Sequence, residues 1–468
     1  MNEQYDIIIL GSGSTAFAAA LRAEGHGARI LMVERGEPGG TCVNWGCIPS
    51  KTLIHSALLR HEALLGQAVG VGTTLARVDY PRLFEHRSEV VEHLRRTRYQ
   101  DVLQGISGLD LVKGTGRLRD RQTVEVAGRL FRSERILVAT GGFPRVLRFP
   151  GLEEVDFLTS MSALLLKELP ASLIIIGGGV IAMELGQMYH RLGCRVTILE
   201  HGPQILPAVE PELADALHRV LTDEGVKVVT GVSICSMGKA GDLSRVSAEV
   251  DGRRHEYTGE RILLAVGTAP ASSGIGLELA GVEVDEKGSV RVDQRMRTSV
   301  EGIWAAGDVT GGQMIASVGA REGIVAVDDM FAPDCGCRMD YHAVPMAIFT
   351  DPEIGIVGYG EEAARLAGFS VKVNVLPVSA IPKAHVTGQT SGVIKMVAER
   401  DTGRLLGVHL LCHRGADLIN EAALAVRYRL TVADLADSLH VYPSMAEGLR
   451  LCAQGFSRDV SRLSCCAE

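Results

Sequence analysis

The chain has 468 residues, of which 46% are hydrophobic and 22% charged. This length predicts several domains with buried cores, and the composition excludes a disordered or collagen-like chain. The 48 basic and 56 acidic residues give a formal net charge of −8 without a run of Lys or Arg, so nucleic acid is not expected as a partner. The N-terminus lacks a secretory pattern and no apolar run is long enough to cross a bilayer, so we expect a cytoplasmic protein with no membrane partner.

Two segments share one pattern, in which an apolar strand, a glycine-rich turn, a helix and a second strand end at a glutamate. They occupy residues 5–34 and 172–200. In such a turn the glycines let the backbone approach a pyrophosphate, the helix start donates N–H groups to it, and the glutamate accepts hydrogen bonds from a ribose. The pattern predicts two dinucleotide sites, with residues Gly11, Gly13, Ala16 and Glu34 in the first and Gly177, Gly179, Ala182 and Glu200 in the second.

A shorter pair of related segments marks where the chain leaves each of these regions. Segments 134–141 and 260–267 each read as a buried strand that runs into a glycine turn, at Gly141 and Gly267. A later short strand ends in a turn that holds Asp308. We therefore predict that the first dinucleotide domain is split and the second is inserted into it. The predicted boundaries are 1–149 and 270–338 for the split domain and 150–269 for the inserted one.

Residues 339–468 have a different character. The patterns predict antiparallel strands and then helices. The predicted strands are 371–380, 392–400 and 403–411, and the predicted helices are 414–429 and 431–439. The expected fold class is therefore α/β, with two Rossmann-like dinucleotide-binding domains, one inserted in the other, and a C-terminal α+β interface domain.

Cys42 and Cys47 follow the first glutamate and are separated by four residues. A helix is predicted from about Pro49 through 50–65, which places Cys47 near a positive helix end that favours a thiolate. We interpret the pair as a redox-active dithiol. A structural or metal-binding role is the weaker alternative, because zinc needs four ligands and no second pair lies at a usual spacing nearby.

The two fingerprints, the segment CVNWGCIPSK at 42–51, the Asp308 turn and the segment PMAIFTDPEIGIVGY at 345–359 together resemble the flavin-dependent pyridine nucleotide disulfide oxidoreductases. The resemblance covers nearly the whole chain. It implies FAD on the first fingerprint, NADPH or NADH on the second, and a homodimer made by a C-terminal dimerisation domain, with each active site completed by the partner chain. It implies that Cys47 faces the flavin, that Cys42 exchanges with substrate and that Lys51 pairs with Glu184. Further cofactor contacts are implied for Thr41, Gly141, Gly267 and Asp308.

The C-terminal segment separates members of this family. Those that reduce disulfides place a His base five residues before a Glu, whereas here Glu447 is preceded at that spacing by Tyr442. A departing thiolate needs a proton donor, and tyrosine, with a pKa of about 10 in water, is a poor one. The adjacent Cys465 and Cys466 can exchange onto a soft, two-coordinate metal ion. This combination resembles the members that reduce Hg(II), and implies that the metal is bound by Cys42, Cys47, Cys465 and Cys466.

The resemblance implies that electrons pass from the nicotinamide through FAD and the dithiol to Hg(II). Because the first strand begins near Tyr5, we expect no N-terminal heavy-metal-binding domain, so that small-molecule thiols or another metal-binding protein would deliver the metal. Members of the family commonly use NADPH, but the Glu200 carboxylate would repel its 2′-phosphate. Only His201 is a nearby basic residue that could bind this phosphate. We therefore expect dual use or a preference for NADH.

Two alternative functions stay open at this point. One is a disulfide reductase similar to dihydrolipoamide dehydrogenase, with His440 as the base in place of Tyr442. The other is a redox-silent protein that sequesters mercury. The remaining cysteines are expected to be less important: Cys335 and Cys337 read as incidental thiols in a surface loop more readily than as a metal site, and Cys194, Cys235, Cys412 and Cys452 as buried small apolar residues.

Overall fold

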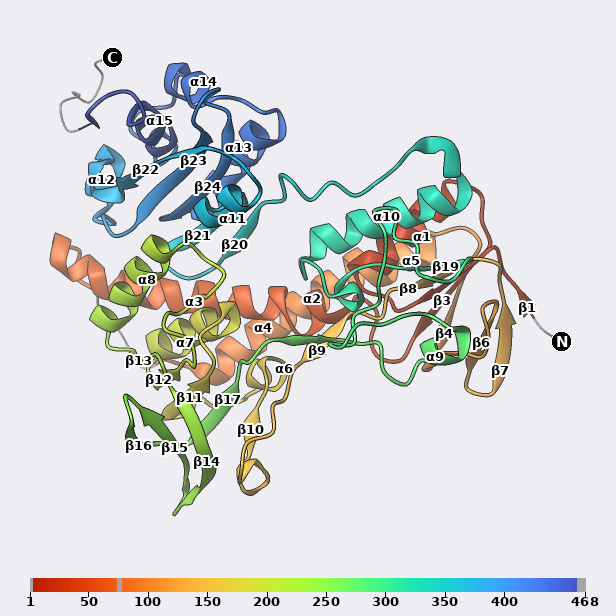
Figure 1. Cartoon of the computed structure of the whole chain (residues 1–468). Helices are drawn as coiled ribbons and strands as arrows, with labels where there is room; N and C mark the ends of the chain where they lie inside the picture. Colours follow the sequence, from red (N-terminus) through yellow and green to blue (C-terminus); the bar gives the residue numbers. More distant parts are fainter. Residues whose placement is uncertain (1–2, 74–77, 461–468) are drawn as a thin grey trace.

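The structure is a computed structural model that describes residues 3–73 and 78–460. Two parallel sheets and a C-terminal antiparallel sheet form its three regions (Figure 1). The predicted α/β fold class is therefore confirmed. In the described parts of the chain, none of the helices has both the length and the apolar character needed to cross a bilayer.

The first parallel sheet has the strand order β19-β8-β2-β3-β4. Its strands are β2 (Ile7–Leu10), β3 (Ile30–Glu34), β4 (Leu109–Lys113), β8 (Ile136–Val138) and β19 (Ile303–Ala305). Successive side chains of a strand point to opposite faces. Ile7 and Ile9 accordingly enter the core beneath helices α1 (Ser14–Glu24) and α10 (Ala316–Phe331), whereas Ile8 and Leu10 enter a second core.

A small four-stranded sheet with the order β1-β7-β6-β5 closes this second core. Its strands are β1 (Glu3–Gln4), β5 (Gly116–Leu118), β6 (Thr123–Val126) and β7 (Arg129–Arg132). β19 pairs in parallel with β8, although Leu137 and its β19 partner Trp304 lie 167 positions apart in the chain. The first parallel sheet is therefore assembled from two separate stretches of chain.

The second parallel sheet has the order β10-β17-β11-β12-β13. Its strands are β10 (Phe157–Leu158), β11 (Ser172–Ile176), β12 (Arg195–Leu199), β13 (Lys227–Val229) and β17 (Arg261–Leu264). Helices α7 (Val180–Leu192) and α8 (Pro211–Glu224) pack with it. An antiparallel sheet of β14 (Ser233–Ala240), β15 (Leu243–Val250) and β16 (Arg253–Gly259), which the sequence analysis did not predict, follows β13. The antiparallel pair β9 (Gly142–Pro144) and β18 (Thr268–Pro270) lies where the chain enters and leaves this region.

The C-terminal region is an antiparallel sheet with the order β20-β21-β24-β23-β22. Its strands are β20 (Met346–Ile348), β21 (Glu353–Gly358), β22 (Val371–Pro377), β23 (Val393–Glu399) and β24 (Leu405–Cys412), and its helices include α11 (Glu361–Leu366), α12 (Pro382–Thr387), α13 (Gly415–Arg427), α14 (Val432–Asp437) and α15 (Glu447–Gln454). The strands and helices predicted after residue 370 are all present, within a few residues of their expected ends.

One apolar core joins all three regions. Leu53 lies on helix α3 (Cys47–Gly66) of the first region, Met183 on α7 of the second, and Ile354 on β21 of the third, and each is at most 1% exposed within this core. Helices α3 and α7 pack against each other. Because α3 begins at Cys47, this packing holds the segment that carries Cys47 against the region of the second parallel sheet.

A buried lysine adds a polar connection between the second and third regions. The side chain of Lys395 on β23 is 2% exposed, and its Nζ lies 2.6 Å from Glu210 Oε2, 2.8 Å from Glu212 Oε1 and 3.1 Å from Glu361 Oε2. Glu210 and Glu212 lie at the start of α8, whereas Glu361 begins α11. One ammonium thus offsets three carboxylates from two domains, an arrangement that is costly to break once it is buried.

Candidate active site

The first dinucleotide turn joins β2 to α1. Gly11 has φ +115°, and a Cβ there would lie 2.3 Å from the carbonyl oxygen of Ala139, so only glycine fits. Gly13 precedes the first residue of α1 without a side-chain cap, which leaves the first N–H groups of the helix available to an anion. Ala16 is fully buried.

A cavity continues from this turn along the carboxyl ends of β2 and β3. Its lining is Leu10, Gly11, Val33, Glu34, Arg35, Gly114, Thr115, Gly116, Thr140, Phe143, Ala271, Ser273 and Ile275. The Glu34 carboxylate accepts a hydrogen bond from Ser12 Oγ at 2.6 Å and another from the Gly36 N–H at 2.6 Å, which holds it at the rim. Gly141 has φ +75° in the adjoining turn. A concave site with a free helix start and a fixed carboxylate fits the adenosine and pyrophosphate parts of FAD.

The second dinucleotide turn, between β11 and α7, repeats this geometry. A Cβ on Gly177 would lie 2.5 Å from the Ala265 carbonyl oxygen, whereas a Cβ on Gly179 would meet nothing within 4 Å. The close approach at Gly177 shapes the turn, and the open space at Gly179 leaves room for a pyrophosphate. Ala182 is fully buried, and Gly267 has φ +108° in the turn after β17.

Glu200 ends β12 and is held by the backbone. Its carboxylate accepts hydrogen bonds from the Gly178 N–H and, at 2.5 Å, from the Gly202 N–H. The neighbouring His201 directs Nδ1 to the Val232 carbonyl at 3.1 Å. The residues of this turn fit a nicotinamide dinucleotide, with a carboxylate in place where a ribose would be recognised.

The dithiol lies on two consecutive helices. Cys42 belongs to α2 (Gly40–Asn44) and is half-buried, whereas Cys47 is the first residue of α3 and is exposed. The helix therefore begins two residues earlier than the expected start at Pro49, which lies within its first turn, where proline is tolerated. Both thiols are free.

A hydrogen bond between the two sulfurs distinguishes their chemistry. The hydrogen bond from the Cys42 thiol, with a further contribution from the Lys51 ammonium, lowers the pKa of Cys47 to about 7. The same hydrogen bond, together with burial, raises the pKa of Cys42 well above its usual range. The shared proton therefore resides on Cys42, and Cys47 carries the thiolate near neutral pH.

The dithiol segment packs directly on the first dinucleotide turn. A Cβ on Gly40 would lie 2.6 Å from the Gly13 Cα, and the Gly39 N–H donates to the Ser12 carbonyl at 2.9 Å. Thr41, on the same short helix, is exposed. These backbone contacts place the dithiol beside the predicted FAD site.

Asn44 is a residue that the sequence analysis missed. Its side chain is buried, and Nδ2 donates to the carbonyl oxygens of Pro38 at 3.1 Å and Gly40 at 3.0 Å. The amide thereby closes the loop that carries Cys42. A polar residue between the apolar Val43 and Trp45 was the available signal for this role.

Lys51 reaches across to the second dinucleotide domain. Its Nζ lies 2.6 Å from Glu184 Oε2, and Glu184 on α7 is 6% exposed. Glu184 Oε1 accepts from the Phe349 N–H at 2.9 Å, and the Phe349 ring lies under the ammonium, 4.7 Å from Nζ to the ring centroid. Phe349 was not identified from the sequence, although it lies in a segment that carries the family resemblance. The three residues hold the ammonium one helical turn from Cys47.

The Asp308 turn is supported by a buried carboxylate. Burial raises the pKa of Asp308, and burial likewise raises that of Glu322. Glu322 Oε2 accepts from the Gly307 N–H at 2.7 Å, and Oε1 accepts from the Tyr341 hydroxyl at 2.7 Å. Glu322 and Tyr341 thus position the backbone next to Asp308, a role that the sequence analysis did not assign.

The polar side chains of the C-terminal segment differ in how far they are exposed to solvent. Tyr442 is 48% exposed, whereas Glu447 at the start of α15 is buried and burial raises its pKa. His440 Nε2 lies 2.8 Å from Glu421 Oε1, and the imidazole is only 7% exposed. This hydrogen bond raises the pKa of His440. Tyr442 and His440 therefore do not present the same face, and Cys465 and Cys466 lie outside the described residues.

Two glycine-rich turns between a strand and a helix, together with a pair of neighbouring thiols, are the arrangement expected of an oxidoreductase that uses dinucleotide cofactors. Residues 5–323 match the family described as pyridine nucleotide-disulphide oxidoreductase, and residues 344–453 match its dimerisation domain. The chain belongs to this family. It is an oxidoreductase that uses FAD and a nicotinamide dinucleotide, and its C-terminal region is a dimerisation domain.

Three known proteins illustrate the range of its relatives. A mercuric reductase of Bacillus cereus is 39% identical over 100% of this chain and 74% of that protein. A dihydrolipoyl dehydrogenase of Thermus scotoductus is 38% identical over 97% of this chain and 98% of that protein. The solved Cu(II) complex of the HOCl-induced flavoprotein disulfide reductase RclA from Escherichia coli has a TM-score of 0.87 and 30% identity, covering 97% of this chain and 99% of that one.

Proposed function

We propose that this chain reduces Hg(II) to Hg(0) with electrons from a nicotinamide dinucleotide. The proposal depends on a contrast between two parts of the chain. The Cys42–Cys47 pair favours a thiolate on Cys47, whereas the C-terminal segment has Tyr442 at the position where disulfide reduction needs a base. Electron transfer to a metal ion requires no proton donor for a leaving group, so this exchange of residue is compatible with mercury but not with efficient disulfide reduction. The full-length similarity to mercuric reductases supports the same reading.

The two cysteines of the dithiol bind Hg(II) by exchange with the thiolates that carry it. Hg(II) bound to two small thiolates transfers to Cys42 and Cys47, which form two Hg–S bonds as two small thiolates leave. The Cys47 thiolate, present near neutral pH, attacks first. Cys42 gives up its proton as the second bond forms, and two electrons then convert the bound ion to Hg(0) and restore both cysteine sulfurs.

FAD, when bound, accepts a hydride from the nicotinamide and supplies an electron pair at the dithiol. The chain contributes position and charge to that chemistry. Gly13 and Gly40 bring the dithiol segment onto the first dinucleotide turn, and Lys51, oriented by Glu184, keeps a positive charge near the Cys47 thiolate. We propose this ion pair as the positioning element that links the two cofactor domains.

We further propose that the two C-terminal cysteines of one chain deliver Hg(II) to the Cys42–Cys47 pair of its partner in a homodimer. Small-molecule thiols or another metal-binding protein would load them, in the reducing cytosol where such thiols are abundant. The dimerisation domain supports the shared site. Replacing Cys465 and Cys466 by Ala should then abolish turnover when competing thiols are in excess.

For the nicotinamide dinucleotide we propose a preference for NADH or use of both forms. Glu200 is fixed by two backbone N–H groups, so its carboxylate cannot easily turn away from a 2′-phosphate. The ratio of kcat/KM for NADH to that for NADPH is expected to exceed one, and Glu200→Ser should lower this ratio by roughly tenfold or more as the repulsion is removed. A strong preference of the unmodified protein for NADPH would contradict the proposal.

A disulfide reductase is the second candidate, favoured by the similarity to dihydrolipoyl dehydrogenase. It would require His440 as the base, yet this imidazole is buried against Glu421. His440→Ala should therefore leave Hg(II) reduction intact, whereas a disulfide reductase that depends on His440 would lose activity toward dihydrolipoamide.

The deciding experiment is Hg(II)-dependent NAD(P)H oxidation by the flavin-loaded protein. Formation of volatile Hg(0), with one NAD(P)H consumed for each Hg(II), is the expected result. Stoichiometric binding of Hg(II) without NAD(P)H oxidation, at every thiol concentration, would instead indicate a mercury-sequestering protein and refute the proposal.

A further inference from the structure

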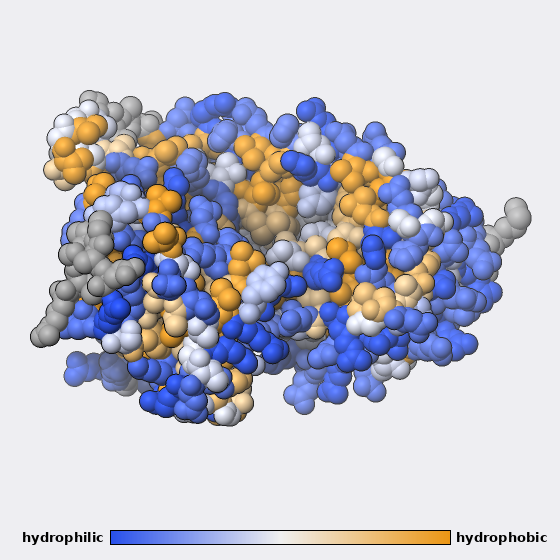
Figure 2. All heavy atoms as spheres, turned by 90° about the horizontal axis from the view of Figure 1, so that it is seen from above, coloured by the Kyte–Doolittle hydropathy of each residue, from blue (hydrophilic) through white to orange (hydrophobic). Residues whose placement is uncertain are grey.

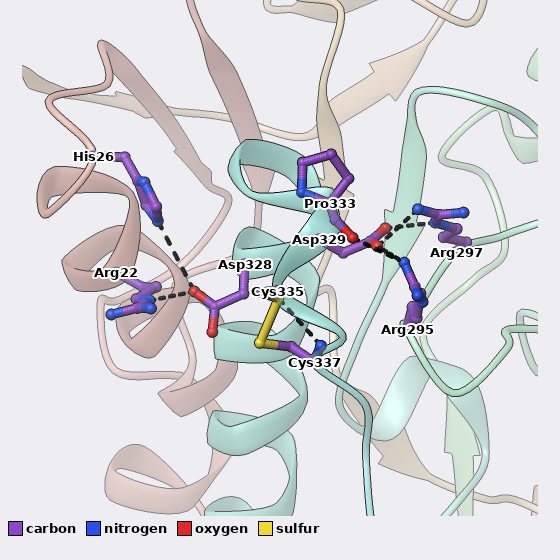
Figure 3. Close-up of a disulfide and its surroundings, with 9 residues drawn as sticks. All are labelled: Arg22, His26, Arg295, Arg297, Asp328, Asp329, Pro333, Cys335 and Cys337. Carbon is purple, nitrogen blue, oxygen red and sulfur yellow. Dashed lines mark hydrogen bonds and ion pairs between the residues drawn. A yellow bond between two sulfur atoms is a disulfide. The ribbon is translucent and has the colours of Figure 1, made fainter.

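A second pair of cysteines lies on the turn that follows α10. Residues Pro333–Cys335 form a short 3₁₀ helix, Gly336 follows with φ +66°, and the sulfurs of Cys335 and Cys337 are joined as a disulfide (Figure 3). The expectation of incidental thiols is thus wrong in one respect, because the turn brings the two sulfurs together. Cys335 is exposed and Cys337 is half-buried.

The base of this turn is held rigidly. Asp329, on the last turn of α10, accepts from Arg297 Nε at 2.5 Å and from Trp304 Nε1 at 3.0 Å. Arg295 Nη1 bridges Asp329 Oδ1 at 3.2 Å and the Pro333 carbonyl at 3.1 Å (Figure 3). The Asp329 side chain is only 1% exposed. The two cysteines therefore stand on a fixed support at the surface, and not on a free chain end.

The surroundings favour a reactive pair. The disulfide spans only two residues in sequence, so its loop contributes little entropic stabilisation, and an exposed disulfide of this kind is readily reduced. The Cys337 N–H lies 3.1 Å from the Cys335 sulfur, where it stabilises negative charge. A Cβ on Gly336 would meet nothing within 4 Å, so space is open beside the turn.

The ligand set of the turn selects the kind of metal. Within residues 3–73 and 78–460, no group of three or more His, Cys, Asp or Glu side chains is placed to hold a metal ion. The turn thus offers two sulfurs and no further ligands, which suits a soft two-coordinate ion and not tetrahedral zinc.

We propose that Cys335 and Cys337, once reduced, form a second Hg(II)-binding thiol pair on the surface. Two small-molecule thiols reduce the disulfide, yielding two cysteine thiols and one small-molecule disulfide. Hg(II) carried by two small thiolates then transfers to the pair, forming two cysteine–mercury bonds and releasing two small thiols as the cysteine protons leave with them. The choice of mercury rests on the proposed function, whereas the existence of a soft-metal pair rests on the turn itself.

The test uses the reduced, flavin-loaded protein and Hg(II) supplied as its complex with two equivalents of glutathione. After removal of free metal, bound mercury is counted per chain, and N-ethylmaleimide labelling with peptide mapping reports which cysteines are protected. The double variant Cys335→Ser/Cys337→Ser is expected to bind one mercury fewer per chain. Cys235→Ser, which removes a single half-buried thiol, is the matched control and should bind the same number as the unmodified protein.

Unchanged mercury binding in the double variant, or full labelling of Cys335 and Cys337 after mercury loading, would overturn the inference. Failure of the proposed function would look different. In that case mercury would protect Cys335 and Cys337 of the unmodified protein from labelling, but Hg(II) would cause no oxidation of NAD(P)H. Hg(II)-dependent NAD(P)H oxidation at saturating substrate is expected to be unchanged in the double variant, because neither cysteine belongs to the catalytic dithiol.

Discussion

Removing the Cys42 thiol tests how the dithiol sets its reactivity. The largest influence on Cys47 is the hydrogen bond from Cys42, which lowers its pKa from an ordinary value of 9.0 to about 7. Cys42→Ala removes this donor while Lys51 stays in place, so the pKa of Cys47 should rise by about 1–2 units, equivalent to ~1.4–2.7 kcal/mol. Since the thiolate is the form above the pKa, its fraction at pH 7 should fall from about one half to roughly 1–10%.

The assay is the pH dependence of iodoacetamide alkylation of Cys47 in the reduced, flavin-loaded protein, followed by peptide mapping. The midpoint of the profile is compared, and not the absolute rate, because nucleophilicity also changes with pKa. Cys42→Ser, which retains a hydroxyl donor, should shift the midpoint less than Cys42→Ala, and Lys51→Met should also shift it less. An unchanged midpoint in Cys42→Ala, or a larger shift in Lys51→Met, would refute the reasoning.

Further predictions concern the turns and the ion pairs. Gly177→Ala should destabilise the fold by about 2 kcal/mol or more, seen as a lower Tm, because its Cβ would strike a carbonyl oxygen, whereas Gly179→Ala should keep the Tm and raise the KM for the nicotinamide dinucleotide. Glu184→Ala should lose about 2 kcal/mol of stability, a value discounted because Lys51 is partly exposed. Glu184→Gln should lose roughly half of that, because the amide oxygen still accepts from the Phe349 N–H. Equal melting temperatures of the two variants would contradict a contribution from that hydrogen bond. Lys395→Met should lower the urea midpoint by the equivalent of about 3 kcal/mol, because three carboxylates would be left facing one another; an unchanged midpoint would contradict a stabilising role.

The features that could be predicted from the sequence are those with local signatures. Gly11 and Gly177 occupy turns whose strand, glycine and helix pattern lies within about thirty residues, and each turn joins a strand to a helix as predicted. The spacing of Cys42 and Cys47 predicts a dithiol, and the structure places the two thiols within hydrogen-bonding contact. The fold class could be predicted because the periodic spacing of apolar residues and the matching segments 5–34 and 172–200 correspond to the strands and helices around the two parallel sheets.

The contacts that could not be predicted join residues distant in sequence. The pairing of Lys51 with Glu184 came only from the family resemblance, since no local pattern relates residues 133 positions apart. The buried Lys395 looks like an ordinary strand residue until α8 and α11 bring carboxylates to it. Glu322 likewise gains its role from folding, which places it against the Gly307 N–H.

The shared apolar core has a consequence for how the domains move. Leu53, Met183 and Ile354 belong to three regions of the chain but to a single packed interior. A hinge that swung the second dinucleotide domain away would have to expose that interior to water, at about 25 cal/mol for each Å² of apolar surface. Separation of the three regions as rigid bodies is therefore disfavoured, and heating should melt them in one cooperative transition.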